Sequence, residues 1–124
     1  MYHYYQKLAA VLLTALLPQT SIFITVGVLI VIDFFCGVYK SIKNGDHFSS
    51  KKMSHTISKV IFYNLAIITG ALIQLHIMPL IPFVTLIASS IAIIEFTSIT
   101  ENITDILGFD IFKKVKEYLK RPTK

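Results

Sequence analysis

The stretch Ser21–Tyr39, SIFITVGVLIVIDFFCGVY, decides the fold, because it is apolar over almost its whole length and holds one charged residue, Asp33. A helix needs about 20 such residues to cross a bilayer core about 30 Å thick. Pro18 precedes the stretch, and it ends on an aromatic ring followed by Lys40, as helices do at a membrane interface. We therefore predict a membrane-spanning helix over 21–39.

A second apolar region follows, since residues 60–94 contain no Asp, Glu, Lys or Arg. This region is long enough for two short spans. Pro79 and Pro82 interrupt it, and because the residue before a proline avoids the helical conformation, they predict a tight turn between antiparallel helices. We expect these helices over about 56–77 and 80–107.

The N-terminal region has an apolar run over 8–17, behind Lys7 and before Pro18. The preferred interpretation is a short or tilted first membrane helix over about 4–17, joined to the next by a turn at 18–21. Two alternatives stay open. The segment could lie on the membrane surface, which leaves three spans, or it could be a secretory signal peptide, although no Ala-x-Ala site follows it.

The composition agrees with a membrane protein. The 124 residues are 54% hydrophobic and 15% charged, and the mean hydropathy is +0.67, whereas a soluble domain carries about 25% charge. Disordered chains have the opposite composition. We expect an all-α fold: three to four transmembrane helices in hairpins form a membrane domain over 1–109, and a basic amphipathic tail covers 110–124.

Basic residues predict the topology, because Lys and Arg in short loops stay on the cytoplasmic side. Eleven of the twelve lie in the segment 40–59 or in the tail. Both segments are therefore expected in the cytoplasm, and the uncharged turns at 18–21 and 79–82 face outward. The C-terminus is then cytoplasmic; four spans put the N-terminus on the same side, and three put it outside.

The tail has the pattern of an amphipathic helix after Gly108. Its apolar residues recur at helical spacing: Ile111, Phe112, Val115, Tyr118 and Leu119. Its basic residues occupy the other face: Lys113, Lys114, Lys116, Lys120 and Arg121. Such a helix binds an anionic lipid surface with about 1 kcal/mol per basic residue.

Two acids lie within or beside the predicted spans, where a charge at the bilayer centre costs about 2.5–3.5 kcal/mol. Asp33 shares a helix face with Gly37 and Lys40, and Glu95 begins a polar row. That row continues with Ser98 and Asn102, and Glu101 and Asp105 form an adjoining acidic row. We expect both acids to meet basic residues of neighbouring helices or subunits and so to set assembly; the alternative is that they anchor the membrane boundary.

Small residues on a predicted span permit close helix approach, and Ala66 and Gly70 form a small-xxx-small pair. We consider this pair a candidate oligomer interface. We predict no metal, cofactor or catalytic site, because the histidines are scattered, Cys36 is the one cysteine and no Gly-rich phosphate loop occurs. The net charge of +5 fits topology and lipid better than nucleic acid.

Three motifs in order resemble the phage holin family that includes the toxin-secretion holins. They are Asp33-Phe-Phe-Cys-Gly-Val-Tyr-Lys40, Ser49-Ser-Lys-Lys52 and Glu95-Phe-Thr-Ser-Ile-Thr-Glu-Asn102. The resemblance covers about 32–108. Cys36 departs from it, because a small or hydroxylated residue is expected there, and the first apolar segment is not covered.

The resemblance implies a protein that accumulates in the bacterial inner membrane, oligomerises and forms lesions through which an endolysin or a toxin crosses without direct contact. The lesion walls would combine the two acids with further polar residues of the spans: Thr69, Gln74, Ser89 and Ser90. Two alternatives remain. One is a membrane scaffold or accessory subunit of a secretion or antiphage system, and the other is a pore-forming antiphage effector.

Overall fold

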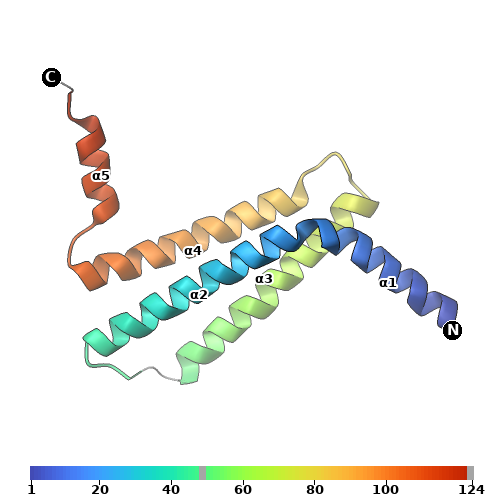
Figure 1. The fold of residues 1–124 in the computed structure, drawn as a ribbon, viewed down its shortest axis with the longest axis horizontal. Helices are drawn as coiled ribbons and strands as arrows, with labels where there is room; N and C mark the ends of the chain where they lie inside the picture. The colour runs from blue at the N-terminus through green and yellow to red at the C-terminus, as the bar shows by residue number, and fades with distance from the viewer. Residues whose placement is uncertain (48–49, 123–124) are drawn as a thin grey trace.

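The computed structural model describes residues 1–47 and 50–122, which form helices joined by short connections (Figure 1). The elements are α1 (Tyr2–Leu16), a 3-10 turn η1 (Leu17–Gln19), α2 (Thr20–Lys43), α3 (Ser50–His76), α4 (Phe83–Leu107) and α5 (Ile111–Lys120). Within the described residues, three helical stretches are long and apolar enough to cross a membrane: Tyr2–Lys43, Ser50–His76 and Phe83–Leu107. The predicted all-α membrane fold is confirmed. Ser49 and Lys124 lie outside the described residues.

The connection between α1 and α2 bends the chain without reversing it. Pro18 lies in the first positions of η1, where its fixed φ suits a helical start, and Leu17 and Thr20 on either side keep right-handed helical angles. In Figure 1, α1 leads away from the bundle at the end where α3 joins α4. The predicted reversing turn at 18–21 is therefore wrong, and α1, η1 and α2 together make up the single apolar stretch Tyr2–Lys43; whether α1 lies on the membrane surface, and on which side the N-terminus lies, stays a prediction.

The turn between α3 and α4 is confirmed, but α4 begins later than predicted. The N–H groups of Ile77 and Met78 both donate to the carbonyl of Ile73 and end α3. Pro82 then takes the N-cap position of α4 with φ −81° and ψ 66°. The helix starts at Phe83 and not near residue 80, because the conformation required before each proline is not helical.

Helices α2 and α3 extend further toward each other than predicted. The first predicted span ended at 39 and the second began at 56, but α2 continues to Lys43 and α3 starts at Ser50. Charged side chains do not end a helix, and those of Lys40 and Lys43 lie in the last turn of α2, where they complement the helix dipole.

The core lies where α2 and α4 run side by side and α3 crosses them (Figure 1). Its buried apolar side chains come from four helices: Ala15, Val26, Ile30, Ile67, Ala71, Val84 and Ile91. Gly70 allows α3 to approach α4 closely, because a Cβ there would lie 2.6 Å from Cδ1 of Ile87. The Ala66–Gly70 pair is thus used in part within one chain, since Gly70 is buried against α4.

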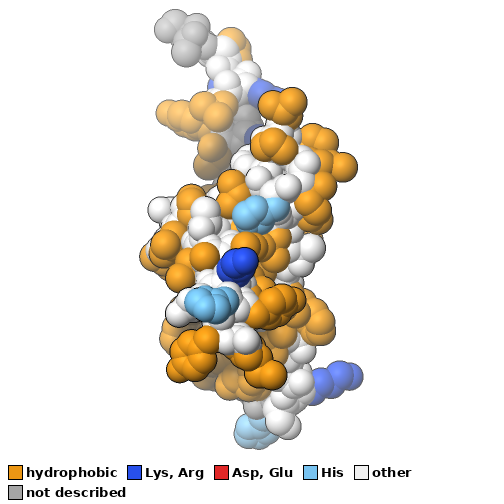
Figure 2. Space-filling view, turned by 90° about the vertical axis from the view of Figure 1, so that its right-hand side faces the viewer, with side chains coloured by type: hydrophobic (Ala, Val, Ile, Leu, Met, Phe, Trp, Pro, Cys, Tyr) orange, Lys and Arg blue, Asp and Glu red, His pale blue; other side chains and the backbone are white. Residues whose placement is uncertain are grey.

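The outer surface is apolar. Figure 2 looks onto the end of the molecule that carries α1 and the α3–α4 turn, and it shows a face covered mostly by hydrophobic side chains with no acidic side chain in view. Large side chains such as Phe62, Leu80 and Ile93 are exposed. A surface of this kind suits a lipid environment.

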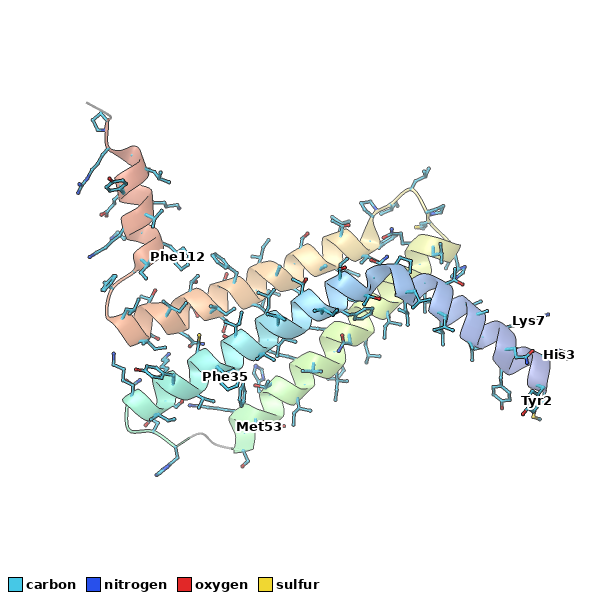
Figure 3. All side chains as sticks on the ribbon, viewed as in Figure 1. Tyr2, His3, Lys7, Phe35, Met53 and Phe112 are labelled. Atoms are coloured by element: carbon cyan, nitrogen blue, oxygen red, sulfur yellow. The ribbon has the colours of Figure 1, made fainter. Side chains whose placement is uncertain are left out.

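Helix α5 leaves the end of α4 at a steep angle and points away from α2 and α3 (Figure 1). Gly108 ends α4 with φ 77°, and the Asp110 side chain then accepts a hydrogen bond from the Lys113 N–H at 3.1 Å. Phe112, labelled in Figure 3, contacts the Phe96 ring edge-on, with the ring centroids 5.3 Å apart. The predicted amphipathic tail helix and its separation at Gly108 are confirmed.

Candidate functional site

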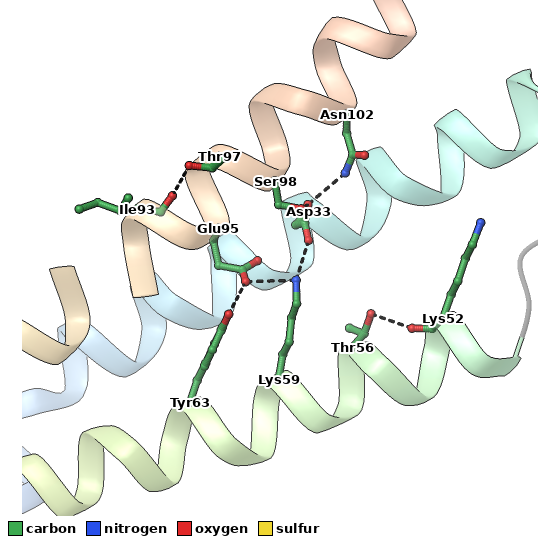
Figure 4. A network of polar contacts seen from close by, with 10 residues as sticks. All are labelled: Asp33, Lys52, Thr56, Lys59, Tyr63, Ile93, Glu95, Thr97, Ser98 and Asn102. Atoms are coloured by element: carbon green, nitrogen blue, oxygen red, sulfur yellow. Dashed lines mark hydrogen bonds and ion pairs between the residues drawn. The ribbon is translucent and has the colours of Figure 1, made fainter. Parts of the chain in front are cut away.

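An ionic cluster joins α2, α3 and α4 at the middle of the bundle (Figure 4). Nζ of Lys59 lies 3.1 Å from Oδ2 of Asp33 and 3.2 Å from Oε1 of Glu95. The side chains of Lys59 and Asp33 are 19% and 13% exposed, and that of Glu95 is completely buried. The prediction that both acids meet a basic residue of a neighbouring helix is confirmed within one chain. Their role between subunits stays a prediction.

Neutral donors complete the cluster. Oδ1 of Asp33 accepts hydrogen bonds from Ser98 Oγ at 2.7 Å and from Asn102 Nδ2 at 3.1 Å. Oε1 of Glu95 accepts one from the Tyr63 hydroxyl at 2.8 Å. These six side chains, Asp33, Lys59, Tyr63, Glu95, Ser98 and Asn102, are called the polar cluster below.

Helical spacing explains why these residues meet. Lys59 and Tyr63 are four residues apart and share one face of α3, just as Ser98 and Asn102 share one face of α4. Gly37 follows Asp33 by one turn, and a Cβ placed there would lie 3.9 Å from Nδ2 of Asn102. Gly37 thus lies beside the α4 amide that reaches the Asp33 carboxylate, at a distance where a Cβ would make only an ordinary contact.

The charges in the polar cluster do not balance, since two carboxylates share one ammonium group. Oε2 of Glu95 is buried and has no hydrogen-bond partner in the described part of the chain. A buried polar atom left unpaired costs about 1–3 kcal/mol, and more when it is charged. The bundle therefore holds its three helices together at a site where one buried carboxylate oxygen has no partner.

A polar pocket leads from the polar cluster to the end of the bundle where α2 and α3 diverge. Its volume is about 800 Å³, and it reaches from Lys51 and Lys52 at the start of α3 down to Asp33 and Lys59. Ser98 and Asn102 of α4 form part of its wall. Water entering at this end can approach the buried ion pair.

Comparison with known proteins identifies the family. A model of the bacteriophage holin family matches residues 10–123. The chain belongs to the bacteriophage holin family. Searches of curated proteins and of solved structures give no match. Holin family proteins are not enzymes, and within residues 1–47 and 50–122 this holin has no group of three His, Cys, Asp or Glu side chains that could hold a metal ion.

Other predicted site residues of the holin lie outside the polar cluster. Lys40 pairs with Asp105 at the end of α2 and does not contact Asp33. Glu101 is exposed, and Ala66 is half-buried on α3. The basic residues of α5 are all exposed on the tail helix: Lys113, Lys114, Lys116, Lys120 and, just after it, Arg121.

The sequence analysis missed two members of the polar cluster. Lys59 was used as one of the basic residues that indicate topology, near the start of the helix predicted over 56–77, and Tyr63 was not considered. Both lie inside α3, which begins nine residues before Lys59. The spacing of a lysine and a tyrosine by four residues, at the edge of an apolar span, is the signal that could have identified them.

Proposed function

We propose that this holin oligomerises in the bacterial inner membrane and forms lesions that release an endolysin or a toxin, so that the host cell lyses. The polar cluster carries this proposal, because it places three charged side chains inside apolar spans of a holin family member. The basic residues of the α2–α3 segment and of α5 support a cytoplasmic C-terminus.

In the proposed closed state, each chain keeps its charged side chains inside the bundle and presents apolar side chains to lipid. Helix α2 packs along α4 through Val26 and Ile30, and these two helices stay together. Helix α3 diverges from α2 at the polar pocket, so it is the helix that moves. When α3 moves out, Asp33 and Glu95 lose Lys59 and face a neighbouring chain.

This arrangement makes opening depend on the density of the protein. A single chain that opened in lipid would expose charges at a cost of about 2.5–3.5 kcal/mol each. Several chains that open together can surround water with the same side chains and avoid much of that cost. Lesions would then form suddenly, once enough copies have accumulated.

The test is expression in bacteria with and without a cytoplasmic endolysin, while membrane potential and optical density are followed. We expect an abrupt loss of potential, and lysis only when the endolysin is present. Endolysin expressed alone is the control. A potential that persists after membrane insertion has been verified contradicts the proposal.

A further inference from the structure

The polar pocket has a polar contact between α2 and α3 at each end. At its inner end, Lys59 pairs with Asp33. At the end where the helices diverge, Nζ of Lys52 donates a hydrogen bond to Oγ of Ser41 at 3.0 Å. Figure 4 shows that the side chains of Lys52 and Lys59 extend from α3 in the same direction. We call the Lys52–Ser41 contact the latch; the proposed function gives it no role.

The antiparallel course of the two helices explains why both contacts form. Helix α2 ends and α3 begins at this end of the bundle, so positions further back along α2 face positions further along α3. Ser41 lies eight residues after Asp33, and Lys59 lies seven residues after Lys52. These separations are rises of about 12 Å and about 10 Å along the two helices. Because the spacings agree, α3 makes both contacts in one register.

The acceptor of the latch is held firmly in place. Ser41 is 5% exposed, although it lies in the last turn of α2. Its carbonyl accepts a hydrogen bond from the Asp46 N–H at 2.8 Å, which fixes the backbone at the end of the helix. A hydrogen bond from an ammonium group is stronger than one between neutral groups, and burial strengthens it further. The latch therefore contributes to holding α3 against α2.

Helix α2 is fastened differently to its other neighbour at this end of the bundle. Lys40 pairs with Asp105 of α4 at 2.5 Å, and Nζ of Lys43 donates to the carbonyl of Ile106. On the side of α3, the polar pocket of about 800 Å³ separates the helices, and the Lys52 side chain crosses it. Separation of α3 from α2 at this end requires the latch to break, while the contacts between α2 and α4 stay intact.

We propose that the latch between Lys52 and Ser41 is an inhibitory contact that sets when α3 leaves the bundle. This inference rests on the proposed function, in which α3 is the helix that moves. The latch lies at the open end of the pocket, where water can replace the Ser41 hydroxyl as the acceptor for the ammonium group. Opening begins there and then reaches the Lys59–Asp33 pair deeper in the bundle.

The first experiment measures how fast a thiol reagent labels Ala71→Cys in the purified full-length protein in detergent, in a Cys36→Ser background. Ala71 lies in the core face of α3 and is 2% exposed, so labelling requires α3 to move. Lys52→Met removes the ammonium group and should raise the labelling rate about tenfold, as expected for the loss of a hydrogen bond to a charged group. Lys51→Met is the matched control, because it removes the same charge from the neighbouring position, and it should label at the natural rate.

Ser41→Ala removes the latch from the side of α2, and it keeps the inference falsifiable if Lys52→Met fails to fold. It should also raise the labelling rate, and the double variant should label no faster than Lys52→Met alone, because the contact is already lost. Lys52→Arg keeps a charged donor and should restore most of the natural rate. Equal rates for Lys52→Met and Lys51→Met overturn the proposal, as does a double variant in which the two single effects multiply.

The second experiment times lysis in cells with matched protein levels. Lys52→Met and Ser41→Ala should lyse earlier than the natural protein, and Lys51→Met should not. Faster labelling of Lys52→Met with an unchanged lysis onset overturns the latch as the contact that sets timing. A natural protein that never collapses the membrane potential contradicts the proposed function instead, and the labelling rates in detergent still decide whether the latch holds α3.

Discussion

Lys59 of α3 places its ammonium nitrogen 3.2 Å from Oε1 of Glu95, a carboxylate with no exposed surface. The same nitrogen also contacts Asp33 of α2, so one side chain connects three helices. In a span surrounded by lipid, such charges are stable only while they face one another. The packing of α2, α3 and α4 in this holin therefore depends on Lys59 staying between the two carboxylates.

Replacing Lys59 by Met should strongly destabilise the bundle, because Asp33 and Glu95 lose their shared cation. Removal of one partner from a buried ion pair costs about 3–5 kcal/mol. Chemical unfolding in detergent micelles measures the change. Lys7→Met is the control, since Lys7 is exposed near the free end of α1 (Figure 3). A Lys59→Met protein as stable as this control contradicts the ionic role of the cluster.

Tyr63→Phe removes the hydroxyl that donates to Glu95 and keeps the ring. A hydrogen bond to a charged group contributes about 1.5–3 kcal/mol, so the free energy of unfolding should fall by about that amount. Tyr39→Phe should change it by less than about 0.5 kcal/mol, because Tyr39 is exposed on α2. Equal effects of the two substitutions would show that the Tyr63 hydroxyl contributes nothing.

Glu95→Gln should delay lysis. The amide oxygen still accepts from Tyr63, while the cluster becomes neutral because Asp33 and Lys59 remain. The closed state is then favoured over the open one. Lysis onset is timed in cells with matched protein levels, measured by immunoblot. Glu101→Gln on the exposed face of α4 is the control, and an unchanged onset for Glu95→Gln contradicts the prediction.

Gly70→Leu should weaken the contact between α3 and α4. The added Cβ would already lie 2.6 Å from Cδ1 of Ile87 and 3.7 Å from the Phe83 backbone, so a leucine side chain must displace Ile87 and overpack the contact, at a cost of about 1–3 kcal/mol. Gly27→Leu is the matched control, because a Cβ at Gly27 has no neighbour within 4 Å. Thermal unfolding of both variants in one detergent makes the comparison, and a Gly70→Leu Tm equal to that of the control contradicts the close approach.

Local patterns in the sequence were enough to predict much of the fold. Uncharged runs predicted the spans, Pro79 and Pro82 the tight turn, and Gly108 the start of the tail. Pro18 was misinterpreted because proline suits both a turn and the first residues of a helix, and only its neighbours' helical angles distinguish the two.

The polar cluster was only half predictable. The cost of burying a charge indicated that Asp33 and Glu95 need partners, but not which ones. Lys59 already lay inside the helix predicted over 56–77, but nothing in the sequence shows that this helix is rotated so that Lys59 faces Asp33 and Glu95. Contacts between helices depend on where each helix begins and how it is rotated, and the composition of a run does not determine either.

The central claim is that α3 leaves the bundle when lesions form, and thiol labelling at Ala71 tests it most directly. Ala71 lies in the core face of α3 and is 2% exposed, so Ala71→Cys in a Cys36→Ser background changes little. Ile61→Cys, on the lipid-facing side of α3, is the control. We predict that a membrane-impermeant thiol reagent leaves both cysteines unlabelled before lysis and labels only Ala71→Cys as the membrane potential collapses. Cells that lyse while Ala71→Cys stays unlabelled would contradict the account.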